Sequence, residues 1–102
     1  MIAAGSDPDL LRRHARGDGE AFGLLVDRYA PRLRSYLRRR AGEHDADDIL
    51  QEVFLRLVRN SRALAGRESI ESWLFTVARN LALDHRRAAR RYRSLSDLDG
   101  TC

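Results

Sequence analysis

The stretch DADDILQEVFLRLVRN, residues 45–60, decides the fold of this chain. Its apolar residues recur at intervals of three and four, the spacing of one face of an α-helix. Asp45 comes just before the first of them and is a natural N-cap. We therefore expect an amphipathic helix that begins after Asp45 and ends at about Arg59. Its buried stripe consists of Ala46, Ile49, Leu50, Val53, Phe54 and Leu57.

Upstream of this stretch, two more helices are expected. The first runs from Pro8 to about Arg16, with Asp7 as its N-cap. The second starts after Asp18, runs towards Arg40 and carries apolar residues at helical spacing. Pro31 lies inside the second helix and predicts a kink or a split there, and Gly42 is expected to end it.

Downstream, a polar loop over residues 60–68 precedes a last helix, which starts after Ser69 and runs to about Tyr92. Ile70, Trp73, Leu74, Val77, Leu81 and Ala88 form its apolar stripe. No apolar–polar alternation of the kind found in strands persists along the chain. The sequence thus predicts an all-α fold, a compact bundle of about four helices.

The length of 102 residues predicts one folded domain, over residues 7–93. Residues 1–6 are expected to be a flexible N-terminus, and residues 94–102 the loose start of a linker. Cys102 is the sole cysteine, so no disulfide can form within the chain, which fits a reducing cytoplasm. No apolar run is long enough to suggest membrane insertion, and residues 1–6 do not resemble a signal peptide.

Charge is unevenly distributed. All 19 basic residues are arginine, and the net charge is +4. Residues 43–52 hold carboxylates and no arginine, whereas residues 79–93 hold six arginines and a single carboxylate. Base composition of the gene is one explanation for the missing lysine, yet arginine also suits phosphate and carboxylate binding. The separation of acidic and basic segments predicts two different partners.

The acidic helix has an outer line of residues opposite its stripe. At 100° per residue this line contains Asp48, Glu52, Leu55 and Arg59, with Gln51 beside it. The functional interpretation is a docking face for a partner helix, with Leu55 as its anchor. A purely structural role remains open, because negative charge is favoured in the first turn of a helix. A metal site is disfavoured, because Asp47 and Asp48 point in different directions.

The last helix has an edge suited to nucleic acid, formed by Trp73, Asn80, Asp84, Arg87 and Arg91. Trp73 can stack on a base, Asn80 and Asp84 can read base edges, and the arginines can hold phosphates. Trp73 as a core residue and Asp84 as a partner of Arg87 are the alternatives. The loop over residues 60–68 could form a pocket for one extruded base or be an ordinary connection.

Three segments resemble region 2 of ECF (extracytoplasmic-function) sigma factors of the sigma-70 family. They are GDGEAFGLLVDRYAPRLRSYLRRR at residues 17–40, the stretch at residues 45–60, and SIESWLFTVARNLALDHRRAARR at residues 69–91. The resemblance implies a sigma region 2 fold and a domain that binds core RNA polymerase and opens the promoter −10 element. It also implies that residues 94–102 begin the linker to a region 4 domain, which this chain lacks, and that an anti-sigma factor covers these surfaces.

The resemblance carries site residues onto this chain. The family's acidic motif binds the clamp helices of the polymerase largest subunit and corresponds to Asp47, Asp48, Ile49, Gln51, Glu52 and Leu55, with a mostly buried Phe54 among them. The family's loop and following helix bind the −10 non-template strand and correspond to Asn60, Arg62, Leu64, Arg67, Trp73, Arg79, Asn80, Asp84, Arg87 and Arg91. The chain departs from the family at Val58 and at Leu64-Ala65-Gly66, which affects the base pocket.

No cofactor, metal or catalytic residue is expected, since no nucleophile–base pair is visible and the three histidines are scattered. The rival from the enzyme class is a metal-dependent phosphodiesterase that uses the acidic helix. The rival from the interaction class is a helical protein-binding adaptor without DNA contact.

Overall fold

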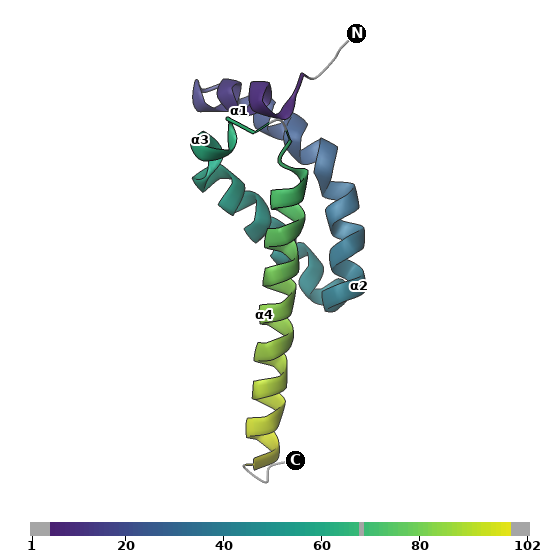
Figure 1. Cartoon of the computed structure of the whole chain (residues 1–102). Helices are drawn as coiled ribbons and strands as arrows, with labels where there is room; N and C mark the ends of the chain where they lie inside the picture. The colour runs from purple at the N-terminus through teal and green to yellow at the C-terminus, as the bar shows by residue number, and fades with distance from the viewer. Residues whose placement is uncertain (1–4, 68, 99–102) are drawn as a thin grey trace.

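A computed structural model describes residues 5–67 and 69–98, with side chains up to residue 94. Within these residues the chain forms α1 (Asp7–Ala15), α2 (Gly19–Arg59), α3 (Ser61–Leu64) and α4 (Glu71–Leu98), and it contains no strand (Figure 1). The all-α class predicted from the sequence is confirmed. The two termini of the described chain lie at opposite ends of an elongated molecule, 60 × 23 × 21 Å in extent.

A sharp corner at Gly42 divides α2 into a first limb, residues 19–41, and a second limb, residues 43–59. Gly42 has φ 84° and ψ 163°, a conformation that residues with a Cβ strongly avoid. The prediction that Gly42 ends a helix is confirmed. Helical geometry resumes directly after Gly42, so the prediction that the next helix begins after Asp45 as its N-cap is wrong.

Of the kink or split predicted at Pro31, the split does not occur, because the first limb stays helical across this residue. Gly42 alone departs from helical geometry among the residues of α2. Pro31 is on the exposed side of the limb, while Tyr29 and Leu33 are buried on the other side. The carbonyl that loses its hydrogen bond to proline belongs to exposed Asp27, where water can satisfy it.

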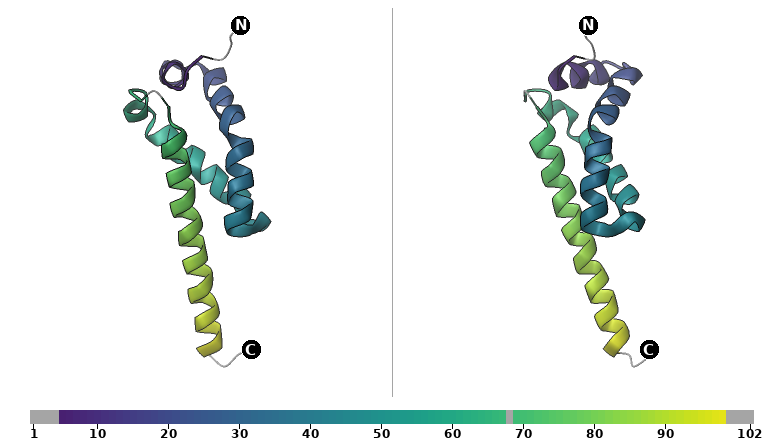
Figure 2. Two further views of the ribbon diagram at one scale, coloured as in Figure 1. Left: turned by 45° about the vertical axis from the view of Figure 1, so that its right-hand side comes forward. Right: turned by 90° about the vertical axis from the view of Figure 1, so that its right-hand side faces the viewer.

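The core is formed by the buried stripes of α1, both limbs of α2, and the first half of α4. The stripe predicted for residues 45–60 is confirmed: Ala46, Ile49, Leu50, Val53, Phe54 and Leu57 are all buried. The second half of α4 projects beyond the bundle (Figure 2). Ala88 is therefore exposed and not part of the buried stripe in which the sequence placed it.

The helix ends differ from the predicted ones in three places. Ser6, not Asp7, is the N-cap of α1: its Oγ accepts a hydrogen bond from the Asp9 N–H at 3.3 Å. The supposed loop after Arg59 contains the short helix α3. Helix α4 continues to Leu98, past the predicted end at Tyr92.

The predicted flexible start and loose tail lie partly outside the described residues, which exclude 1–4 and 99–102 as well as Glu68. Gly5 and Ser6, however, take part in ordered contacts, because the Gly5 carbonyl accepts a hydrogen bond from Arg28 at 2.7 Å. No helix in the described part of the chain is long and apolar enough to cross a membrane.

Candidate functional site

A buried carboxylate joins three segments of the chain at the end of the bundle where α1, α2 and the start of α4 meet. Asp7 is 4% exposed. It accepts hydrogen bonds from Arg28 Nη1 at 2.7 Å, from the Tyr29 hydroxyl at 2.5 Å and from the Ile70 N–H at 3.0 Å. Burial and the bond to this carboxylate raise the pKa of Tyr29 to about 12. Asp7 was predicted only as an N-cap, because no local pattern in the sequence indicates contacts with residues this distant.

The acidic face of the second limb is where the sequence predicted it. Asp47, Asp48, Gln51 and Leu55 are exposed, and Leu55 keeps 44% of its surface accessible. Phe54 is mostly buried, as expected. Ile49 is 1% exposed and packs in the core, so it supports this face from beneath and cannot contact a partner directly.

An apolar groove runs beside the acidic face, between the two limbs of α2. It has a volume of about 390 Å³. Phe22, Val26 and Ala30 line one wall from the first limb, and Leu50, Phe54, Leu55 and Val58 line the other. Val58 is 41% exposed at the groove rim. Phe22, Val26 and Ala30 were not predicted as part of a site, although their spacing of four places them on one face of a helix.

The carboxylates around the groove form ion pairs within the domain. Asp47 pairs with Arg34 of the first limb at 3.2 Å, which connects the two limbs at the groove. Glu52 pairs with Arg56 at 3.1 Å and with Arg59 at 3.5 Å along its own helix. These pairs are largely exposed and contribute little to stability. Their exposure leaves the charges able to exchange partners when another protein binds.

The edge predicted on α4 is accessible. Asn80, Asp84, Arg87 and Arg91 are exposed on α4, as is Arg79. Trp73 is partly buried and packs against the core, and the rest of its surface is accessible. Arg87 Nη1 lies 3.9 Å from Asp84 Oδ1, a weak surface pair that leaves both groups accessible. An aromatic ring, an amide and guanidinium groups thus follow one another along the helix.

The segment before α4 has a more defined structure than the sequence suggested. Asn60 is exposed, and its side chain donates a hydrogen bond to the Arg56 carbonyl at 2.8 Å. Arg62 and Arg67 are exposed. Leu64 is 2% exposed and belongs to the core, because it lies on the inner side of α3. Its predicted contact with DNA is therefore ruled out for the domain in this conformation.

No group of three or more His, Cys, Asp or Glu residues within the described ranges is arranged to hold a metal ion.

The molecule thus combines an apolar groove with an acidic rim on α2 and a polar, arginine-rich edge on α4, which together define a helical binding domain. The family model for Sigma-70 region 2 matches residues 25–92. The chain belongs to this family, and its relatives are sigma factors of the ECF group.

The ECF RNA polymerase sigma-E factor of Escherichia coli K12 is 33% identical over 94 residues, which cover 92% of this chain and 49% of the relative. The ECF RNA polymerase sigma factor BldN of Streptomyces coelicolor is 37% identical over 85 residues, 80% of this chain and 32% of the relative. This chain therefore spans half or less of the length of these relatives.

Among solved structures, the chain is similar to an engineered region 2 of sigmaE, determined by NMR in complex with GTAAAA. The TM-score is 0.77 at 31% identity, and the match covers 90% of this chain and 97% of the other. The sigma region 2 fold predicted from the sequence is therefore confirmed.

Proposed function

We propose that this domain acts in transcription initiation by holding the promoter −10 element as a single strand on α4 while α2 binds core RNA polymerase. The observation that carries the proposal is the exposed line Asn80, Asp84 and Arg87 on a fold that, in its sigmaE counterpart, is in complex with GTAAAA. An amide and a carboxylate can read base edges, and arginine can hold phosphates. The domain performs no covalent chemistry in this proposal.

The proposed DNA contacts come from the exposed polar residues of α4 and of the segment before it. They are Asn60, Arg62, Arg67, Trp73, Arg79, Asn80, Asp84, Arg87 and Arg91. Opening the duplex costs a few kcal/mol per unstacked base step. Stacking on the exposed part of Trp73 and phosphate contacts offset this cost.

The proposed polymerase contact is the apolar groove and its acidic rim. Leu55 and Val58 offer exposed apolar surface beside a concave space of about 390 Å³, which suits side chains from a partner helix. Asp47, Asp48, Gln51 and Glu52 surround that surface with groups that can pair with basic residues. We take the clamp helices of the polymerase largest subunit as this partner, and we place the domain in the cytoplasm with it. An anti-sigma factor that covers both surfaces is a further proposed partner.

A separation-of-function experiment tests both halves of the proposal. Glu52→Arg and Leu55→Ala should weaken retention on core polymerase and leave binding to single-stranded DNA unchanged. Asn80→Ala and Arg87→Ala should do the opposite. Tyr92→Ala is the matched control for Leu55→Ala, because Tyr92 is a 75% exposed apolar side chain on α4, away from the groove.

The sequence preference of the domain is tested by selection from single-stranded DNA that contains a random hexamer. We expect the wild-type chain to enrich a defined motif and the Asn80→Ala variant to lose that enrichment. If all sequences bind equally, or if the α4 variants leave function intact, the domain is a protein-binding adaptor and the DNA half of the proposal is wrong.

A further inference from the structure

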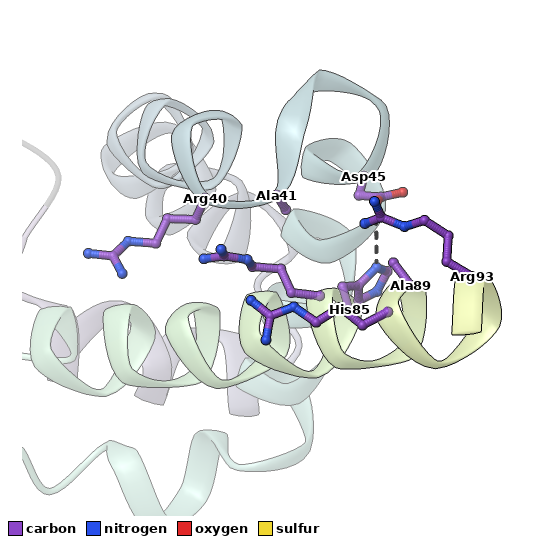
Figure 3. Close-up of a pocket in the computed structure, with 8 residues that line it drawn as sticks. Arg40, Ala41, Asp45, His85, Ala89 and Arg93 are labelled. Carbon is purple, nitrogen blue, oxygen red and sulfur yellow. Dashed lines mark ion pairs between the residues drawn. The ribbon is translucent and has the colours of Figure 1, made fainter. Parts of the chain in front are cut away.

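A hollow lies at the corner of the bundle, where Gly42 turns the chain and α4 begins to project. It has a volume of about 320 Å³. Figure 3 shows Asp45 of α2 beside His85, Ala89 and Arg93 of α4, while the side chain of Arg40 extends away from them. Arg40 and Ala41 also line this space. Arg86 and Arg90 complete its lining.

The hollow follows from small residues at the point where two elements separate. Ala41 and Ala89 have side chains too short to fill the space between α2 and α4. Gly42, with its positive φ, then turns the second limb away from the first. A concave space therefore remains beside the projecting half of α4, and its surroundings are long arginine side chains on both helices.

The lining has a strong excess of positive charge. Arg40, Arg86, Arg90 and Arg93 oppose the single carboxylate of Asp45. The Asp45 carboxylate lies 3.9 Å from His85 Nδ1, closer than to any of the four arginines. Among the described residues, no ion pair involves any of the four arginines. Arg40, Arg86 and Arg90 thus have no carboxylate partner among the described side chains and can approach an anion from outside the chain.

A second hollow extends the first along the first limb of α2. It has a volume of about 380 Å³, shares Arg40 and Arg86, and adds Tyr36 and Arg39. The Arg40 guanidinium carbon lies 4.7 Å from the centre of the Tyr36 ring. The basic region is therefore longer than a single phosphate group and has an aromatic side chain at its far end.

This region faces a different direction from the proposed DNA edge. Arg86 directly precedes Arg87, and a step of one residue is a rotation of about 100° around the helix. Arg90 and Arg93 lie on the same side of α4 as Arg86 and line the first hollow with it. Asn80 and Arg87 line neither hollow. A strand bound along the edge would leave the corner open.

We propose that the corner hollow binds a compact polyphosphate anion, either inorganic or the phosphate chain of a nucleotide. Arginine forks match phosphate oxygens and can surround a multiply charged group from several sides. The volume is in the lower range of pockets that hold small ligands, and it exceeds the need of a single phosphate. This inference does not rest on the proposed function, since it uses no residue of the DNA edge or of the groove.

Calorimetric titration of the full chain with sodium tripolyphosphate tests the proposal directly. We expect saturable 1:1 binding that is stronger than binding of pyrophosphate, which in turn is stronger than binding of orthophosphate. Arg90→Ala should weaken the binding about tenfold through the loss of a charged hydrogen bond. Ala89→Leu keeps every charge but fills the floor of the hollow, and it should weaken binding at least as much.

Arg12→Ala is the matched control, because Arg12 is an exposed arginine on α1, which lies at the other end of the bundle from the corner (Figure 1). It should leave the affinity unchanged. Equal weakening by Arg12→Ala, an affinity unaffected by Ala89→Leu, or the absence of saturation would overturn the proposal in favour of diffuse attraction to a basic surface.

A parallel titration with ATP distinguishes the two sources of the anion. Tighter binding of ATP than of tripolyphosphate, lost in Tyr36→Ala, supports a nucleotide whose base lies over the second hollow. Equal affinity supports an inorganic polyphosphate. Because Ala89→Leu should leave single-strand binding intact, failure here is distinguishable from failure of the proposed function.

Discussion

The backbone N–H of Ile70 donates a hydrogen bond of 3.0 Å to the carboxylate of Asp7, 63 positions earlier in the chain. Ile70 directly precedes α4, and Asp7 is the first residue of α1. One buried carboxylate thus fixes where α4 starts relative to the rest of the bundle. The polar edge of α4 takes its position from this contact.

Asp7→Ala should destabilise the domain by about 3 kcal/mol, because it leaves Arg28, the Tyr29 hydroxyl and the Ile70 N–H without their shared acceptor. Urea denaturation followed by circular dichroism measures this loss. Asp9→Ala is the control: Asp9 lies in the same helical turn and makes only a 3.9 Å pair with Arg13. A loss for Asp7→Ala no larger than that for Asp9→Ala would contradict the assignment.

The stability of the domain should fall as the pH rises from 10 to 12. The pKa of Tyr29 is raised in the folded state to about 12, above its ordinary value of 10.0. The stabilisation from the neutral phenol is therefore complete below pH 10 and is lost as the pH passes through the folded pKa. Tyr29→Phe should remove this pH-dependent part, and at neutral pH it should cost about 1–2 kcal/mol through the lost hydrogen bond. Denaturation at a series of pH values measures both effects, and a variant with the same alkaline decline as wild type would exclude Tyr29 as its source.

Two glycines of α2 should respond in opposite directions to the same substitution. Gly42→Ala places a Cβ on a residue with φ 84° and should destabilise the domain by about 1–3 kcal/mol. Gly23→Ala is in the middle of the first limb with open space around the added Cβ, and should stabilise it by about 0.5–1 kcal/mol. Thermal unfolding of the two variants measures both effects. At neither glycine does the added Cβ meet a packed neighbour within 4 Å. A loss of stability in Gly42→Ala alone therefore results from backbone conformation and not from crowding.

Binding of the domain to its single-stranded DNA should weaken steeply with salt. Each phosphate contact adds about 0.7 to the slope of log affinity against log salt concentration for single strands. Arg87→Ala should lower that slope by about this amount, whereas Asn80→Ala should leave the slope unchanged and reduce sequence preference. Fluorescence anisotropy at several salt concentrations separates these effects. An unchanged slope in Arg87→Ala would show that Arg87 does not hold a phosphate.

The helices of the bundle were predictable from sequence where a local pattern controls them. The stripe from Ala46 to Leu57 was correct because a helix repeats every 3.6 residues and a core accepts only its apolar face. Gly42 was identified as a helix end because glycine tolerates the conformation that ends one. The exposed residues of α4 were placed on one edge by the same geometry.

The remaining features depend on contacts between distant segments, which no local pattern encodes. Pro31 was predicted to kink or split the helix, and no split occurs, because Tyr29 and Leu33 on either side of it both pack in the core. Leu64 was expected to bind DNA because the family resemblance placed it in the base-binding loop, and α3 instead turns its side chain into the core. The corner hollow depends on how α2 and α4 separate, which the sequence alone does not specify.

The projecting half of α4 lacks neighbours that could hold it in shape, so its helicity depends on its own residues. Arg86 and Arg90, like Arg87 and Arg91, are spaced four apart and repel each other along the helix. An anion in the corner hollow neutralises the pair Arg86 and Arg90, removes its repulsion and stabilises the turns of α4 that carry it. The domain should therefore keep this part of α4 helical to a higher temperature when it is loaded with an anion, so ellipticity at the helical minimum becomes a direct optical signal of occupancy.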